Sequence, residues 1–382
     1  MIFPFRMPET LYMGSGALER LGAEARRFGS KAILLTDKVL VRAGVVEPVL
    51  AALQAAGVTV TVFDEVEQEP STENCEQSAA VVRGSGAEFL VAVGGGSVLD
   101  VAKGCSILAT NGGAISDYFG IDKVPAAGLP WIGLPTTAGT GSEVTPNAIF
   151  TDKAKQLKIG VVSPFLFPTV AIVDPVLTLT APPSITAATG MDALTHAVEA
   201  FTAPKATVQT DMYAVQAINL ISRSLRRAVW AGRDIQARTD MALGSTLAGI
   251  SFANAGVGAV HALAYPLGGQ FGIPHGVSNA LLLPHVMGFN MLADVTKFAR
   301  VAEAMGEDVQ GLSARAAAEA AVKAAALLSE DVGIPQRLRD VNIPESALEG
   351  LAAAAMNVTR LLDNNPRKVT LKDARALYQA AY

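Results

Sequence analysis

The stretch "AEFLVAVGGGSVLDVAKG", residues 87–104, places an apolar run, three glycines and a helical pattern in direct succession. The apolar run predicts a buried strand. The glycines let a ligand approach the backbone, and the helix that follows, opened by Ser97, offers unpaired N–H groups and a favourable dipole. A cofactor pyrophosphate is one ligand for such a turn, although the spacing is not GxGxxG; the alternative is a tight turn in which Ser97 and Asp100 form a capping box. The candidate phosphate contacts are Gly94, Gly95, Gly96 and Ser97.

Around this unit, strand and helix signals alternate. Short β-branched or apolar runs occur at 31–37, 58–66, 129–137 and 169–175, and residues 45–57 have helical spacing. Strands separated by helices of this length indicate a parallel sheet covered on both faces, which binds ligands at the carboxyl ends of its strands.

Beyond Pro182 and Pro183 the strand signals stop and only helical segments follow. The predicted helices cover 210–230, 236–252, 257–268, 276–292, 295–305, 312–331, 345–357 and 370–382. The predicted fold class is therefore α/β plus all-α: a Rossmann-like parallel-sheet domain over 1–181 and an all-helical domain over 182–382. The cleft between two such domains is the default place for a site.

Two more features could hold a nucleotide at the strand ends. The loop "PTTAGTGSEVT" (135–145) is rich in hydroxyl groups that suit ribose and phosphate oxygens, or that serve ordinary turn chemistry. Asp37 ends the first strand, where an acid can bind the ribose hydroxyls and disfavour a 2′-phosphate; taken alone, it is more simply explained as an ordinary helix N-cap or turn residue.

A metal constellation stands out in the helical half, because the chain has only four histidines. Asp192 and His196 are spaced i, i+4 and so share one helix face, while His261 and His275 follow further along. Each alone is more simply a buried, hydrogen-bonded residue, and Asp192 could cap a helix. Together they are costly to bury unless a divalent cation joins them, and His285 is left out as structural.

The composition excludes several classes of protein. A net charge of −5 argues against nucleic acid as a partner, and no apolar stretch is long enough to span a membrane. The amino terminus shows no signal-peptide pattern. Cys75 and Cys105 lack CxxC spacing, which indicates reduced thiols and a cytoplasmic location.

Five motifs together resemble the iron-containing (group III) alcohol dehydrogenases, which share a fold with glycerol dehydrogenase and dehydroquinate synthase. They are "GGGSVLDVAK", "PTTAGTGSEVT", "AATGMDALTHAVEA", "HALAYPLGG" and "PHGVSNALLLPH", and the likeness extends over essentially the whole chain.

The resemblance implies a cytoplasmic, homodimeric, NAD(H)-linked oxidoreductase with a divalent metal, usually Fe(II), although this donor set suits Zn(II) as well. The implied metal ligands are Asp192, His196, His261 and His275. The implied cofactor contacts are Asp37, Gly94, Gly95, Gly96, Ser97, Thr136, Thr137, Thr140, Thr145 and Lys158. The implied substrate pocket is formed by Asn147, Ile149, Phe252 and Leu361.

One position departs from the family pattern. Many members have a histidine where this chain has Tyr265, which shares a helix face with His261. Either the Tyr265 phenol carries the proton that this histidine is thought to relay, or the ring fills space while water and the cofactor ribose carry it.

The implied reaction is hydride transfer between a small primary alcohol or diol and its aldehyde, with the metal acting on the substrate oxygen. The apolar pocket positions favour short unbranched substrates over acids. The alternatives on the same fold are a glycerol dehydrogenase-type or maleylacetate reductase-type enzyme and a dehydroquinate synthase-like lyase. A non-catalytic nucleotide-binding or scaffold protein would not need both cofactor loops and all four ligands.

Overall fold

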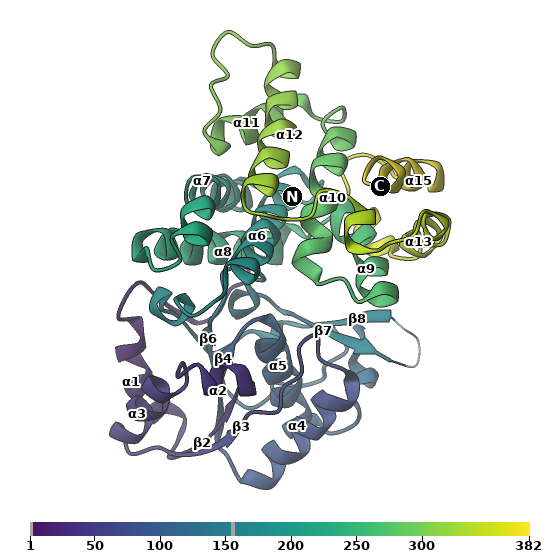
Figure 1. The fold of residues 1–382 in the computed structure, drawn as a ribbon. Coiled ribbons are helices and arrows are strands. Elements are labelled where there is room, and N and C mark those ends of the chain that lie inside the picture. The colour runs from purple at the N-terminus through teal and green to yellow at the C-terminus, as the bar shows by residue number, and fades with distance from the viewer. Residues whose placement is uncertain (1–2, 154–156) are drawn as a thin grey trace. The chain divides into compact units, whose positions relative to one another are not determined.

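The computed structural model describes residues 3–153 and 157–382, which form two compact units (Figure 1). One unit is Phe5–Ala181 and the other is Pro182–Tyr382, with which Phe3 and Pro4 are grouped. The predicted fold class, a parallel-sheet region followed by an all-helical region, is confirmed.

The first unit is built on a six-stranded sheet in the order β1-β9-β6-β4-β2-β3, in which every pairing is parallel. Its strands are β1 (Thr10–Met13), β2 (Lys31–Leu35), β3 (Thr59–Phe63), β4 (Phe89–Gly94), β6 (Trp131–Pro135) and β9 (Val170–Val173). The five strands predicted from the sequence are present. Strand β1, which was not predicted, lies at the sheet edge beside β9.

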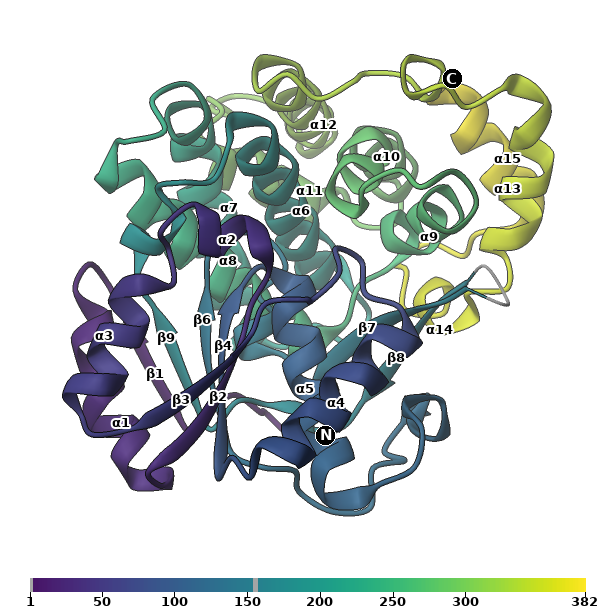
Figure 2. The ribbon, with the colours of Figure 1, turned by 60° about the horizontal axis from the view of Figure 1, so that its bottom comes forward.

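Helices cover both faces of this sheet because its central strands are apolar on both sides. Along β2, Ile33 and Leu35 face one core while Ala32 and Leu34 face the other. Figure 2 shows α1 and α3 on one side and α4 and α5 on the other. The helices of this unit are α1 (Leu21–Phe28), α2 (Lys38–Arg42), α3 (Glu47–Ala55), α4 (Thr72–Ser85) and α5 (Gly96–Asn111).

A second, three-stranded sheet was not predicted. Its order is β5-β8-β7, formed by Gly120–Ile121, Leu157–Val162 and Asn147–Asp152, with β7 and β8 antiparallel. It carries Asn147, Ile149 and Lys158 of the predicted site.

The helical unit begins where two prolines make a helix start, with Pro182 extended at the N-cap and Pro183 in the first turn. Its helices are α6 (Pro183–Thr202), α7 (Val208–Trp230), α8 (Ile235–Ala255), α9 (Ala259–Phe271), α10 (His275–Asn290), α11 (Val295–Met305), α12 (Ala314–Asp331), α13 (Leu348–Ala355), α14 (Thr359–Leu362) and α15 (Leu371–Ala380). The central helix is α6, which packs against α7, α8 and α10 and is buried almost throughout its second half.

Short 3-10 turns join many of these elements. They are Ala17–Arg20, Ile115–Tyr118, Ser142–Val144, Pro164–Leu166, Pro175–Thr178, Leu338–Val341 and Glu345–Ala347. Within the described residues, no single helix meets the length and hydropathy needed to cross a membrane; only the bent pair α8 and α9 meets them when taken together.

Candidate functional site

Helix α6 carries a polar stripe through the interior of the helical unit. Asp192, His196 and Glu199 are spaced i, i+4 and i+7, so they leave the helix on one side. All three are more than nine-tenths buried. Because α6 begins at Pro183 and Asp192 lies in its middle, the interpretation of Asp192 as a helix cap is wrong.

Helices α9 and α10 bring two histidines to Asp192. His261 Nε2 lies 4.0 Å and His275 Nε2 lies 3.8 Å from Asp192 Oδ1, and one ligand atom from each of the three residues lies within 4.8 Å of the others. The close approach of α10 to α6 requires glycine at position 276, where a Cβ would lie 2.4 Å from the carbonyl oxygen of Ala188.

His196 lies beside this group. Its ring stacks on that of His261, with the centroids 4.7 Å apart, and on that of Phe252, with the centroids 4.3 Å apart. In the described part of the chain the three converging ligand atoms come from Asp192, His261 and His275. The role of His196 as a fourth ligand therefore stays a prediction.

The surroundings of Asp192 keep its carboxylate charged. Burial acts to raise the pKa of Asp192, but the neighbouring His196, His275 and His261 and the amide of Asn279 together hold this pKa below its usual value. The site thus combines a carboxylate oxygen with imidazole nitrogens in a buried place.

Glu199 is a residue of the candidate site that was not predicted from the sequence. Its Oε2 lies 2.5 Å from His261 Nδ1, and its Oε1 accepts a hydrogen bond of 2.6 Å from the backbone N–H of Val260. With the ring proton held on Nδ1 by this carboxylate, the lone pair of His261 is on Nε2, which faces Asp192. Histidines that bind metals are commonly oriented by a carboxylate in this way. The spacing of Glu199 after His196, i and i+3, was the signal that could have found it.

We expect Glu199→Gln to weaken metal binding about 10- to 100-fold, the usual effect of losing an orienting partner of a metal ligand. The amide keeps the size of the side chain and an oxygen for Val260, so α9 should stay folded. The measurement is the dissociation constant for Zn(II) by competition with a chromophoric chelator. An unchanged dissociation constant for Zn(II) would show that Glu199 serves only to accept the backbone N–H of Val260 at the start of α9.

The donor set fits a divalent cation. Zn(II) and similar ions take carboxylate oxygen and neutral imidazole nitrogen at about 2.0–2.2 Å, which places the ligand atoms of a tetrahedral site about 3.3 Å apart. The separations of 3.8 and 4.0 Å are slightly wider than this. The chemistry of the donor atoms therefore suits a divalent cation.

In the sheet unit, the predicted cofactor loops follow neighbouring parallel strands. Asp37 follows β2, the glycine turn follows β4, and the threonine loop follows β6. The backbone N–H of Thr136 donates to the carbonyl oxygen of Gly94, which joins the two loops. The structure thus gathers these segments at one edge of the sheet, where α/β proteins bind nucleotides.

The threonine loop leaves no room for a side chain at Gly96 and little room at Gly95. A Cβ at Gly96 would lie 2.6 Å from Thr140 Cγ2, and one at Gly95 would lie 3.3 Å from Thr137 Oγ1. The N-cap of α5 is Gly95, while Asp100 turns away to accept hydrogen bonds from Ser142 and Ile149. The capping box of Ser97 and Asp100 is therefore wrong.

Asp37 is the N-cap of the short helix α2. Its Oδ1 accepts from the backbone N–H groups of Val39 at 2.8 Å and Leu40 at 2.9 Å. The cap interpretation of Asp37 is thus correct. Because both bonds end on Oδ1, the cap does not use Oδ2, and a ribose contact through that oxygen stays a prediction.

Lys158, on β8, forms an ion pair of 3.0 Å with Glu69. The N–H of Glu69 donates to Ser97 Oγ at 3.1 Å, so this pair lies against the glycine turn. A ribose contact by Lys158 remains a prediction, and in the structure its charge is balanced by Glu69.

Lys103 is a second residue near the predicted loops that was not predicted from the sequence. It is fully buried on α5, and its Nζ donates to Ser142 Oγ at 2.6 Å, Thr145 Oγ1 at 3.1 Å and the carbonyl oxygen of Asn147 at 2.6 Å. Burial lowers the pKa of Lys103, whereas Asp100, 3.5 Å away, opposes that shift. Lys103 therefore anchors the end of the threonine loop to the helix that follows the glycine turn, and Thr145 is used in that anchor.

The predicted pocket residues lie in both units. Asn147 and Ile149 are partly exposed on β7, whereas Phe252 on α8 stacks on His196 and Leu361 on α14 is buried. Tyr265 lies on α9 with its ring centroid 6.1 Å from that of His275. The roles of these residues in the pocket and at the site stay predictions.

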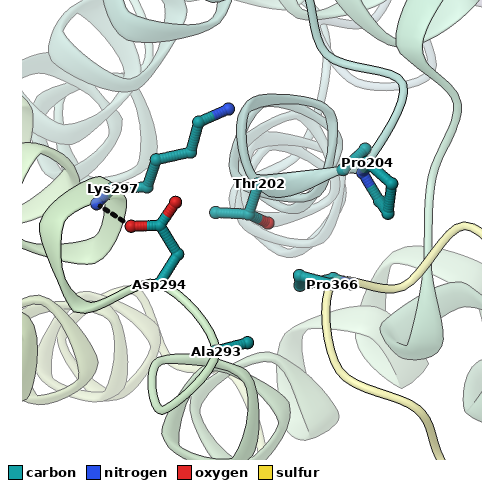
Figure 3. Close-up of a pocket in the computed structure, with 7 residues that line it drawn as sticks. Thr202, Pro204, Ala293, Asp294, Lys297 and Pro366 are labelled. Atoms are coloured by element: carbon teal, nitrogen blue, oxygen red, sulfur yellow. Dashed lines mark hydrogen bonds between the residues drawn. The ribbon is translucent and has the colours of Figure 1, made fainter.

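A pocket of about 280 Å³ opens at the carboxyl end of α6 but contains none of the predicted site residues (Figure 3). Its lining residues are Thr202, Ala203, Pro204, Ala293, Asp294, Lys297 and Pro366. Lys297 donates to the carbonyl oxygen of Phe201, and Asp294 caps α11. Because its two charged groups already serve the helix ends, this pocket is not the candidate site.

Comparison with known proteins identifies a family for this chain. The model of the iron-containing alcohol dehydrogenase family matches residues 8–175, and the model of that family's C-terminal region matches residues 186–382. Long-chain-alcohol dehydrogenase 1 of Geobacillus thermodenitrificans is 46% identical over 98% of this chain and 95% of its own length. The NAD-dependent methanol dehydrogenase of Bacillus methanolicus is 39% identical over 99% of both chains. The crystal structure of a 1,3-propanediol oxidoreductase, 43% identical, superposes with a TM-score of 0.97 and covers both chains completely.

The chain belongs to the iron-containing alcohol dehydrogenase family. It is an oxidoreductase that interconverts alcohols and aldehydes, and NAD(H) and a divalent metal are its cofactors.

Proposed function

We propose that this protein interconverts a short, unbranched primary alcohol or diol and its aldehyde, with NAD(H) as the hydride carrier. The observation that carries the proposal is the convergence of Asp192, His261 and His275 in a buried site, with Glu199 orienting one imidazole. The relatives are named for long-chain alcohols, for methanol and for 1,3-propanediol, so membership of the family leaves the chain length of the substrate open.

In this proposal the helical unit binds the metal and the substrate, and the sheet unit binds the dinucleotide. Asp192, His196, His261 and His275 hold a divalent cation, which supplies Lewis acidity to an alcohol or carbonyl oxygen. The glycine turn and the threonine loop hold the pyrophosphate and nicotinamide half of the cofactor, so residues 1–181 bind dinucleotide and residues 182–382 bind metal and substrate. Ile149, Phe252 and Leu361 supply apolar contacts that keep water from the reacting carbon.

The test is carried out after reconstitution with Fe(II) or Zn(II). The consumption of NADH is measured with a panel of aldehydes from two to ten carbons, and the reduction of NAD is measured with glycerol and 1,3-propanediol. We expect turnover with short unbranched aldehydes that disappears on chelation. Activity that is unaffected by chelation, or that requires a dicarboxylate substrate, would contradict the proposal.

We also propose a cytoplasmic homodimer that binds neither nucleic acid nor membranes. The free, buried Cys75 and Cys105 support a reducing compartment, and the net charge of −5 is unfavourable for nucleic acid. The dimer rests on the family resemblance, and analytical ultracentrifugation tests it.

Under the proposed function, the carboxylate of Asp37 selects NADH over NADPH. Asparagine caps helices as well as aspartate does, so Asp37→Asn should leave α2 intact while removing the charge that repels a 2′-phosphate. We expect the ratio of kcat/KM for NADPH to that for NADH to rise about tenfold, corresponding to about 1.4 kcal/mol of lost repulsion. The matched control is Glu65→Gln, which removes the neighbouring exposed carboxylate that pairs with Lys38. An equal change in both variants would show a general charge effect.

Tyr265 is proposed to relay a proton at the site. In Tyr265→Phe the ring and its packing near His275 are retained while the hydroxyl is lost. We expect kcat to fall about tenfold at unchanged metal content, less than the loss of a complete acid–base group because water and the cofactor ribose also carry protons. Unchanged kcat and an unchanged pH profile would assign the ring to space filling, and Tyr265→His tests whether the family's histidine works here.

A further inference from the structure

Asn279 lies among the atoms that converge on the candidate metal site. It was not predicted as a site residue from the sequence. It is on α10, four residues after His275 and so on the same helix face, and it is fully buried. Its Nδ2 lies 2.6 Å from Asp192 Oδ1 and 3.2 Å from Nε2 of both His261 and His275.

The direction of the amide follows from its neighbours. The carboxylate of Glu199 holds the proton of His261 on Nδ1, which leaves a lone pair on Nε2. If the amide oxygen were turned toward Asp192 and the two imidazoles, its lone pairs would be repelled by the lone pairs of the carboxylate oxygen and of both Nε2 atoms. The amide nitrogen has two hydrogens, of which one serves Asp192 and the other is shared between the imidazoles.

The amide oxygen indicates that this arrangement has a function beyond packing. Asn279 Oδ1 is buried and has no hydrogen-bond partner among the described residues. A buried polar atom without a partner lowers stability, whereas a leucine side chain would fill almost the same volume without that cost. We therefore attribute the presence of asparagine at this position to the contacts that its amide nitrogen makes.

We infer that Asn279 is a positioning residue of the metal centre, whose amide nitrogen fixes the carboxylate of Asp192 and gathers the lone pairs of His261 and His275 around one point. This inference rests on the proposed function. An N–H group and a cation compete for an imidazole lone pair, but a carboxylate has lone pairs for both. The bond to Asp192 is the contact that Asn279 can keep when the site is loaded.

The test uses Asn279→Leu in the full-length protein and measures Co(II) and Zn(II) binding, with the visible spectrum of bound Co(II) as a report on its ligand geometry. We expect the dissociation constants to rise about 10- to 100-fold and the Co(II) bands to change. The matched control is Ser278→Ala, the preceding residue of α10, which is equally buried and whose hydroxyl has no hydrogen-bond partner among the described residues. This control should bind and absorb like the unmodified protein.

A leucine variant with unchanged dissociation constants and an unchanged Co(II) spectrum would overturn the inference. So would a variant whose metal-free protein melts at lower temperature while its metal binding stays normal, because that result shows a purely structural role. If Asn279→Leu does not fold, Asn279→Ala decides: it removes the amide without adding a ligand or a charge, so an altered Co(II) spectrum supports the inference and an identical one contradicts it. If the unmodified protein binds no Co(II), the proposed metal centre itself is wrong, and that outcome is distinct from all the others.

Discussion

His275→Ala is expected to abolish turnover by loss of metal while the protein remains folded. His275 is the first residue of α10, and its side chain is 29% exposed, so its removal opens no sealed cavity. The proposed site loses one of its imidazoles, and the substrate oxygen loses its Lewis acid. We expect kcat to fall by more than about a hundredfold, because loss of a ligand costs more than loss of a ligand's partner.

Three measurements define this result: metal content by elemental analysis, NADH binding by fluorescence, and thermal unfolding. NADH should still bind, because the glycine turn and the threonine loop belong to the sheet unit. His285→Ala is the matched control, since it removes a histidine from the same helix and should retain metal and activity. Stoichiometric metal with near-normal turnover in His275→Ala would remove His275 from the site, and loss of metal in the control would point to His285 instead.

Lys103→Met is expected to destabilise the protein by about 3–5 kcal/mol, the usual cost of leaving one member of a buried ion pair without its partner. Lys103 is fully buried and the Asp100 side chain is only 15% exposed, so water replaces the lost ammonium group poorly. In the variant, the hydroxyl oxygens of Ser142 and Thr145 and the carbonyl oxygen of Asn147 also lose the hydrogen bonds that Lys103 Nζ donates to them. NADH binding should therefore weaken together with stability.

The matched experiment is a double-mutant cycle with Asp100→Asn, measured by urea unfolding. Removing the carboxylate charge from the Lys103→Met background should recover part of the lost stability, because no uncompensated buried charge remains. A Lys103→Met variant within about 0.5 kcal/mol of the unmodified protein, the range of ordinary surface substitutions, would contradict the role of this pair.

The sequence by itself determined the fold class and indicated the residue types of the candidate site. A fully buried parallel strand reads as an unbroken apolar run, as in residues 89–93, and a glycine turn followed by a helical pattern is local information. The i, i+4 spacing of Asp192 and His196 likewise follows from the geometry of a single helix. These features could be predicted because each depends on residues adjacent along the chain.

Strands that depend on partners could not be predicted in this way. Strand β1 is four residues long and lies at the sheet edge beside β9. In the β7–β8 pair, glycine and lysine interrupt the alternation of β8. Their strand conformation comes from pairing with distant segments, which intrinsic preference does not reveal.

Only the tertiary structure decided which polar groups serve the site. Asn279 reaches Asp192 across 87 residues of chain, and Glu199 reaches His261 across 62. Sequence spacing shows that two residues share a helix face, but it does not show which faces of different helices meet. That meeting is set by packing, as where Gly276 lets α10 approach the backbone of α6. Packing within the sheet unit likewise buries Lys103 and makes it the anchor of a predicted cofactor loop.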